Sequence, residues 1–218
     1  DRVNRNEWDA VKKAGLTLTI VPGPTTSPDG LNRKENHAAI EERFKTMVAE
    51  AAAAKAHSII VFSGNRKGMA DQEGAENCVI GLNRIKKYAE DAGILVVMEL
   101  LNSKVNHKDY MCDHTAWGVE VMKAVNSPQV KLLYDIYHMQ IMEGDVIRTI
   151  RENHQWIGHY HTGGNPGRNE IDETQELYYP AIARAIADTG FQGYIAHEFI
   201  PKREPLVSLK QAVDLIRV

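Results

Sequence analysis

Four residues of the kinds that bind metal ions or transfer protons each stand at the end of a short apolar segment. They are Glu99, Asp135, His161 and Glu198. Three carboxylates gathered in a buried site repel one another, so either one takes up a proton or a cation binds between them. One imidazole with several carboxylate oxygens and no thiolate favours Mn²⁺, Mg²⁺ or Co²⁺ over structural zinc. The four residues therefore predict a divalent metal site if their segments meet in space.

A metal ion flanked by two glutamates suits the transfer of a proton beside a carbonyl group. A divalent ion can chelate a hydroxyl and the adjacent carbonyl and stabilise an ene-diolate. Glu99 and Glu198 would then be the catalytic pair that removes the proton and returns it at the neighbouring carbon. Taken singly, a glutamate at a strand end is usually a solvated rim residue, Asp135 could cap a turn, and His161 could be a core histidine. Their recurrence at one depth favours a shared site.

The segments that carry these residues are predicted strands, and they alternate with predicted amphipathic helices. The apolar runs are rich in β-branched residues and lack strict alternation, as expected for parallel strands covered by helices. Gly15, Gly93 and Gly190 each follow a predicted helix, where a left-handed residue closes the last turn. The predicted helices cover 6–14, 34–55, 75–92, 114–126, 144–153, 177–189 and 205–217. The predicted strands cover 16–21, 58–62, 94–100, 130–136, 156–161 and 194–199.

This alternation predicts an α/β fold built from repeated βαβ units around one parallel sheet. No GxGxxG or GxxxxGK[ST] motif follows a predicted strand, which removes the usual phosphate-loop signals of an open sheet. In a (β/α)₈ TIM barrel the carboxyl ends of all strands converge on one mouth, whereas an open sheet would spread these residues along an edge. We therefore predict the barrel.

The sequence shows six predicted strands, and a closed barrel has eight. We expect the chain to lack the first one or two β/α units, about forty residues at the N-terminus. The alternative is that two irregular strands, for example near Val3 and Thr25, escape the pattern. Residues 1–218 are accordingly expected to form a single, N-terminally incomplete TIM-barrel domain.

Alternation along each strand predicts which side chains face the barrel interior. Each of the four site strands would place a ligand-type residue at the top of its inward face, above mostly apolar layers. The predicted inward sets are Leu95, Val97 and Glu99; Lys131, Leu133 and Asp135; Ile157, His159 and His161; and Tyr194, Ala196 and Glu198. His197 is expected to point outward, toward the helices.

Composition excludes several other classes of protein. The chain has 218 residues, is 43% hydrophobic and carries a formal net charge of −3, so it has no general electrostatic reason to bind nucleic acid or an anionic membrane. The longest apolar run, 94–98, is far too short to span a bilayer. Cys78 and Cys112 show no CxxC spacing, and a disulfide between them is unsupported, so we expect a reducing, cytoplasmic setting.

Several segments around the site residues resemble a known family. The run DIYHMQIMEGD at 135–145 closely resembles a signature of the hydroxypyruvate isomerase family, one of the xylose isomerase-like barrels alongside the ketose 3-epimerases. The segments ELLN at 99–102 with Val105-Asn106, HYH at 159–161 with PGRNE at 166–170, and 193–198 resemble further parts of that family. The likeness covers essentially the whole chain from Trp8 onward.

The resemblance implies roles for residues around the predicted metal set. It implies that Glu99 and Glu198 exchange the proton and that His138 and Arg168 hold the substrate. Asn102 and His107, which follow Glu99 on the mouth side, are further candidates for substrate contact. Some hydroxypyruvate isomerases carry Gln at the position of His161, so this chain resembles the metal-dependent members. Glu170 and Asp172 are expected to be solvated loop charges or to orient Arg168.

These observations lead to one preferred activity and several alternatives. The preferred activity is conversion of hydroxypyruvate to tartronate semialdehyde, and the same residues would serve a ketose 3-epimerase acting on a longer substrate. A sugar-binding barrel that has lost catalysis is a second alternative. A nuclease of the endonuclease IV type would need more histidine ligands and a basic groove. Alanines at 49, 51–54 and 56 predict close packing against the barrel or a contact in a homo-oligomer.

Overall fold

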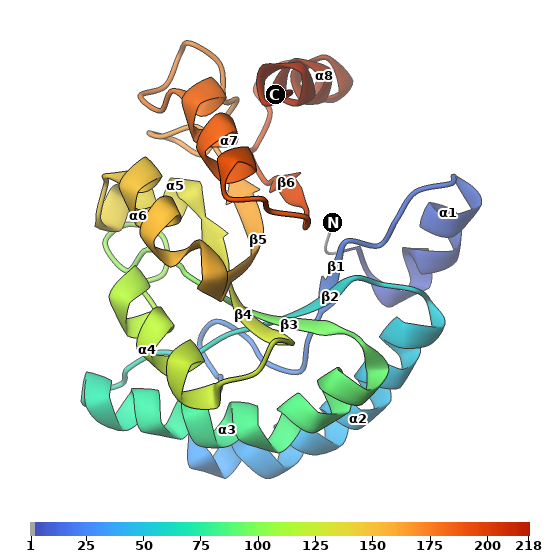
Figure 1. The fold of residues 1–218 in the computed structure, drawn as a ribbon, viewed down its shortest axis with the longest axis vertical. Helices are drawn as coiled ribbons and strands as arrows, with labels where there is room; N and C mark the ends of the chain where they lie inside the picture. The colour runs from blue at the N-terminus through green and yellow to red at the C-terminus, as the bar shows by residue number, and fades with distance from the viewer. Residues whose placement is uncertain (1–2) are drawn as a thin grey trace.

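Six parallel strands form one curved sheet in which the spatial order follows the chain (Figure 1). The computed structural model describes residues 3–218. The strands are β1 (Ile20–Pro22), β2 (Ser58–Val61), β3 (Leu95–Glu99), β4 (Val130–Asp135), β5 (Ile157–Thr162) and β6 (Ile195–His197). Every neighbouring pair is parallel. This succession is that of the (β/α)₈ barrel, of which the described residues supply six strands.

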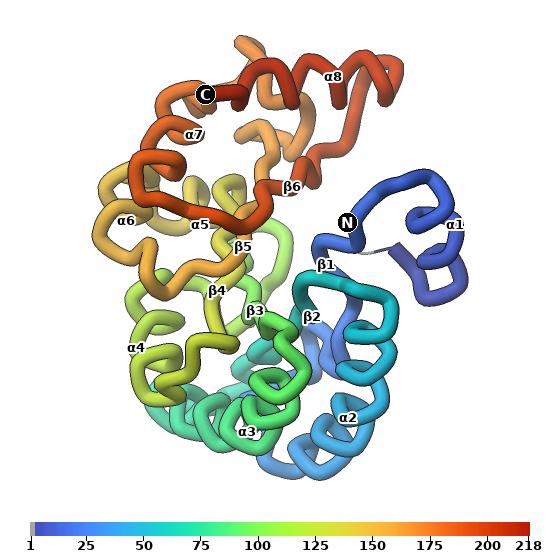
Figure 2. Tube along the Cα trace, turned by 45° about the vertical axis from the view of Figure 1, so that its right-hand side comes forward, coloured from blue at the N-terminus to red at the C-terminus, as the bar shows by residue number. Residues whose placement is uncertain are grey.

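Helices cover the outer face of the sheet, and α2 and α3 lie side by side along it (Figure 2). The α-helices are α1 (Trp8–Lys13), α2 (His37–Ala53), α3 (Asp71–Ala92), α4 (Thr115–Val125), α5 (Ile136–Met142), α6 (Val146–Asn153), α7 (Tyr179–Asp188) and α8 (Pro205–Leu215). Single 3₁₀ turns are η1 (Arg5–Glu7), η2 (Lys34–Asn36) and η3 (His154–Trp156). The glycines predicted to close helices have positive φ angles of 72° (Gly15), 66° (Gly93) and 77° (Gly190), which confirms that prediction.

Two hydrophobic clusters lie on the two faces of the sheet. The larger one fills the space between the strands and the helices and extends from Trp8 to Ala212. The smaller one occupies the inner face and consists of Ile20, Ile60, Val97 and Leu133, with Phe62 and Leu95 packed against it. Val97 of β3 and Leu133 of β4 belong to this inner cluster. This confirms the predicted inward direction of these side chains, below Glu99 and Asp135.

The beginning of strand β5 departs from the simple alternation of side-chain directions. The register shifts between Leu132 and Leu133, so that Leu132 pairs with Ile157 and Leu133 pairs with His159. Gly158 is therefore an extra residue, and a Cβ built on it would come within 2.7 Å of Leu95 and 2.9 Å of Lys131. Ile157 belongs to the outer cluster, so the prediction that it faces inward is wrong, because the bulge reverses the side-chain direction at that end of the strand.

Two further observations concern membrane spans and the cysteines. Within residues 3–218, no helix has the length and apolar character that crossing a bilayer requires. Cys78 and Cys112 are both buried, and both are free thiols.

Candidate metal centre and active site

The four predicted metal ligands converge at the carboxyl ends of the strands. Glu99 ends β3, Asp135 ends β4, His161 is the second-to-last residue of β5, and Glu198 directly follows β6. One ligand atom from each lies within 4.8 Å of the ligand atoms of the other three. Residues separated by up to 99 positions in the chain are thus brought to one point by the parallel sheet, as the strand-end positions predicted.

The spacing and chemistry of the cluster fit a single divalent cation. His161 Nδ1 lies 3.3 Å from Glu99 Oε1, 3.3 Å from Glu198 Oε2 and 3.9 Å from Asp135 Oδ2. Donors about 2.0 to 2.3 Å from a common ion lie at most about 4.6 Å from one another, which agrees with these separations. Asp135 Oδ2 is buried and accepts no hydrogen bond from residues 3–218, so it is available to a cation.

Asp135 is placed by the start of a helix that the sequence pattern did not reveal. Helix α5 begins directly after β4, with Asp135 as its N-cap residue. Asp135 Oδ1 accepts a hydrogen bond of 3.1 Å from the backbone N–H of His138, which leaves Oδ2 facing the cluster. In this one conformation Asp135 can cap α5 through Oδ1 and serve as a metal ligand through Oδ2.

Arg168 reaches the cluster from the loop that follows β5. Its guanidinium pairs with Glu198 Oε2 and lies 3.8 Å from Asp135 Oδ2. The guanidinium also lies 5.6 Å from the centre of the Tyr137 ring, within reach of a cation–π contact. Its backbone is left-handed, with φ of 58°, and its N–H donates to the Gly164 carbonyl over 2.7 Å. The loop therefore holds the backbone of Arg168, while Glu198 and Tyr137 hold its guanidinium.

The other predicted substrate residues lie together beside Asp135. His138 is fully buried, and its Nε2 lies 3.7 Å from Asp135 Oδ2. Asn102 Nδ2 lies 2.6 Å from His138 Nδ1, and the ring of His107 lies 5.3 Å from that of His138. Burial lowers the pKa of His138, against the opposite effect of Asp135, and burial likewise lowers the pKa of His107. Neutral imidazoles therefore line this side of the mouth near pH 7.

Two residues next to the site, Tyr137 and Tyr110, were not singled out by the sequence analysis. Tyr137 donates a hydrogen bond of 2.9 Å to Asn106 Oδ1, and its ring lies under Arg168. Tyr110 is fully buried and donates to the backbone carbonyl of Glu99 over 2.8 Å. Tyr137 lies between Asp135 and His138 in the resembling motif, which was an available signal. Tyr110 lies in a loop, and no periodicity marks it.

The acidic residues after Arg168 are not solvated, contrary to expectation. Glu170 and Asp172 are 5% and 7% exposed. Glu170 accepts hydrogen bonds from the backbone N–H groups of Lys202 and Arg203, and Asp172 pairs with the Arg203 guanidinium over 2.6 Å. These contacts join the Arg168 loop to the segment between β6 and α8, and so the two acids hold the loop rather than Arg168 directly.

His197 lies beside Glu198 but outside the cluster. Its Nδ1 lies 2.8 Å from the hydroxyl of Thr162, the neighbour of His161 on the opposite face of β5. Burial lowers the pKa of His197 to about 4, so its imidazole is neutral at pH 7. The expected structural role of His197 agrees with this position.

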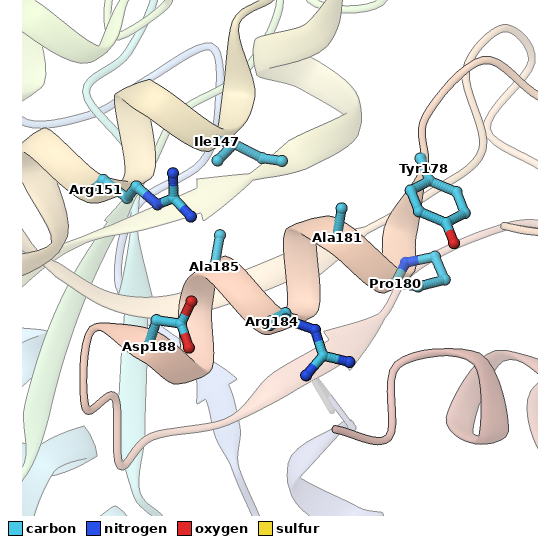
Figure 3. Close-up of a pocket in the computed structure, with 8 residues that line it drawn as sticks. All are labelled: Ile147, Arg151, Tyr178, Pro180, Ala181, Arg184, Ala185 and Asp188. Carbon is cyan, nitrogen blue, oxygen red and sulfur yellow. The ribbon is translucent and has the colours of Figure 1, made fainter.

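A groove on the outer surface is separate from the site. It lies between α6 and α7 (Figure 3). Its lining consists of Ile147, Arg151, Tyr178, Pro180, Ala181, Arg184, Ala185 and Asp188. None of these residues lies at the carboxyl ends of the strands, where barrel enzymes carry their chemistry.

Fold and site together define a TIM-barrel protein with a cluster of metal-ligand residues at the mouth of its sheet. The chain belongs to the xylose isomerase-like TIM barrel family, whose sequence profile matches residues 6–217. The putative hydroxypyruvate isomerase of Homo sapiens is 26% identical over 210 residues, covering 92% of this chain and 76% of that protein. The D-psicose 3-epimerase of Ruminiclostridium cellulolyticum is 28% identical over 197 residues, covering 84% of this chain and 64% of that enzyme. The protein is thus a member of an isomerase family.

One solved structure shows how closely the fold is shared. The AP endonuclease, family 2, from Brucella melitensis aligns with a TM-score of 0.88 and 24% identity, covering 95% of this chain and 81% of that one. At this identity the likeness establishes the fold alone. The matches span 50% to 76% of the length of four proteins named putative hydroxypyruvate isomerase.

Proposed function

We propose that this protein is a metal-dependent isomerase that moves a proton between adjacent carbons of a small hydroxy-carbonyl compound. Its substrate is hydroxypyruvate and its product is tartronate semialdehyde. The single observation that carries the proposal is the meeting of Glu99, Asp135, His161 and Glu198 within 4.8 Å of one another. The relatives named hydroxypyruvate isomerase support the choice of substrate.

The four residues would hold Mn²⁺, Mg²⁺ or Co²⁺ through three carboxylates and one imidazole. When bound, such an ion polarises a carbonyl and stabilises negative charge on neighbouring oxygens. The remaining chemistry belongs to side chains. The planar guanidinium of Arg168 suits a carboxylate or a pair of hydroxyl groups. His138 and His107 are uncharged groups beside Asp135 that would orient the substrate, and Asn102 lies against His138.

Proton transfer is assigned to the two glutamates at the ends of β3 and β6. One of them removes a hydrogen from C3 of hydroxypyruvate as a proton, and a proton is returned to C2. In the same reaction the hydroxyl proton on the C3 oxygen is lost and the C2 oxygen gains one, so the substrate and product have the same composition. Arg168 pairs with Glu198 and so holds this carboxylate in place.

A ketose 3-epimerase is the second candidate. The same groups would then remove a proton from C3 of a ketose and return one to the other face of that carbon. The relative named D-psicose 3-epimerase supports this alternative. The two candidates differ in the length of substrate that the mouth admits.

The first experiment supplies purified protein and Mn²⁺ with hydroxypyruvate or with D-psicose in D₂O and follows both reactions by ¹H NMR. We expect tartronate semialdehyde carrying deuterium at C2. Turnover of the ketose alone would replace the first assignment by the second.

A second experiment tests the proton-transfer residue. We expect Glu198→Gln to lower kcat by roughly 10²- to 10⁴-fold, the contribution typical of a general acid or base. Exposed Glu152→Gln is the matched control and should keep the wild-type rate. Unchanged turnover in Glu198→Gln would remove this residue from the reaction.

A further inference from the structure

The side-chain amide of Asn102 has a fixed orientation. Its Oδ1 accepts two backbone hydrogen bonds, from Val105 N–H over 3.0 Å and from Asn106 N–H over 2.9 Å. Exchanging the oxygen and nitrogen of this amide would set its NH₂ group against two N–H donors. Nδ2 must therefore be the atom that faces His138 Nδ1, at 2.6 Å.

The neighbouring contacts agree with this direction. Asn106 Oδ1 lies 2.8 Å from Asn102 Nδ2 and 2.9 Å from the Tyr137 hydroxyl, so it accepts from both. Each donor of this network meets an acceptor, and the amide hydrogens of Asn102 are divided between Asn106 and His138. The amide of Asn102, which is fully buried, is thus engaged by the protein on every side.

We propose that Asn102 is a positioning residue that holds His138 as the neutral tautomer with its proton on Nε2. An amide N–H that points at Nδ1 requires a lone pair there, and a neutral imidazole then carries its single hydrogen on the other nitrogen. An imidazolium also carries a hydrogen on Nδ1, and that N–H would face the amide N–H of Asn102. Asn102 therefore acts through His138, in place of direct substrate contact.

The consequence concerns the chemistry of the mouth and rests on the proposed function. His138 Nε2 lies 3.7 Å from Asp135 Oδ2, at the edge of the ligand cluster. Carrying a hydrogen, this nitrogen donates to a substrate oxygen and offers no lone pair to remove a proton. His138 is then a binding group, and proton transfer is left to the glutamates.

The test is an NMR experiment on the imidazole groups in the absence of substrate. Protein labelled with ¹⁵N-histidine is examined by a long-range ¹H–¹⁵N correlation spectrum near pH 7.5, first metal-free and then with Mg²⁺. The His138 signals are identified by their loss in His138→Gln. We expect the pattern of a neutral ring protonated at Nε2 in both samples. A proton on Nδ1 of the wild-type ring would overturn the proposal.

Asn102→Asp sharpens the test. Aspartate keeps an oxygen for the N–H groups of Val105 and Asn106 and changes the atom facing His138 from a donor to an acceptor. We expect the His138 proton to appear on Nδ1 in this variant. The matched control is Asn106→Asp, which adds the same charge at an exposed position, keeps its acceptor oxygen and should leave Nε2 protonated.

Retention of the Nε2 proton in Asn102→Asp would refute the role of Asn102. If that variant does not fold, the wild-type spectrum still decides the tautomer. Because no substrate is present, a protein inactive on hydroxypyruvate would contradict the proposed function and leave the spectral result intact.

Discussion

Tyr110 connects two strand ends beneath the mouth through one buried hydroxyl. The hydroxyl donates to the Glu99 carbonyl over 2.8 Å and accepts from the Ser63 N–H over 3.0 Å. Ser63 follows β2 and Glu99 ends β3. The Tyr110 side chain therefore holds the backbone at the end of β3, from which the Glu99 carboxylate projects. A residue outside the ligand set thereby contributes to its geometry.

We expect Tyr110→Phe to lower the free energy of unfolding by about 2 kcal/mol, because two buried backbone groups lose their partner. Urea denaturation of the wild type and the variant measures the difference. Tyr178→Phe is the control, since Tyr178 is 73% exposed and its change should stay within about 0.5 kcal/mol. Equal stability of Tyr110→Phe and the wild type would show that the hydroxyl contact has no net value.

Among the elements, the loop after β5 depends on the segment before α8. Glu170 accepts hydrogen bonds from two backbone N–H groups after β6 and from the Ser208 hydroxyl. Burial opposes the charge of Glu170, but its own backbone N–H and these donors hold its pKa at about 2, below the ordinary value of 4.5. The loop that presents Arg168 is thereby joined to α8.

This shift of pKa predicts a pH dependence of stability. The folded protein holds the Glu170 proton less tightly than the unfolded chain, so the stabilisation is complete above about pH 4.5 and is lost as the pH falls toward 2. Glu170→Gln should lower stability at pH 7 and flatten its decline below pH 4.5. Denaturant titrations across pH 7 to 3 measure both effects. Exposed Glu173→Gln should reproduce the wild-type curve, and a Glu170→Gln curve parallel to it would contradict the assignment.

The sequence predicted elements best where the information is local. Strand ends, helix-closing glycines and the inward direction of Glu99 and Asp135 follow from periodicity and from single-residue preferences. The bulge at Gly158 was not predictable, because it depends on the pairing of β5 with β4 and not on the strand itself. Helix α5 was missed because no turn residue separates it from β4 and it is only seven residues long, so the sequence pattern assigned 137–142 to no element.

Contacts across the mouth could be predicted only in part. The convergence of the four ligand residues follows from the barrel topology. The hydrogen bonds of Asn102 to His138 and of Tyr110 to Glu99 depend on loop conformations, which carry no periodic signal. The burial of Glu170 was hidden for the same reason, since its partners lie some thirty residues further along the chain.

At the scale of the whole molecule, a cation at the mouth would join β3, β4, β5 and the residue after β6. The unfolded chain does not bring these residues together, so a bound ion stabilises the folded state. The inner face beneath the site holds a small cluster of apolar side chains. A bound ion would therefore add to the hydrogen bonds and ion pairs that hold the mouth together.

We expect Mn²⁺ to raise the melting temperature of the protein. An ion at about one hundred times its dissociation constant contributes about 2.7 kcal/mol to the free energy of unfolding. Differential scanning fluorimetry with and without Mn²⁺ measures the shift. Asp135→Asn should reduce it strongly, and exposed Asp214→Asn should retain it. A shift of the same size in all three proteins would place the ion elsewhere.

The two oxygens of Asp135 serve different partners, one in the helix and one in the ligand cluster. A shift of the Asp135 carboxylate would therefore also move the first turn of α5, which carries His138. An ion bound at Oδ2 would therefore be coupled to the position of the His138 imidazole. Binding of a cation at the cluster and binding of substrate at His138 should then each strengthen the other.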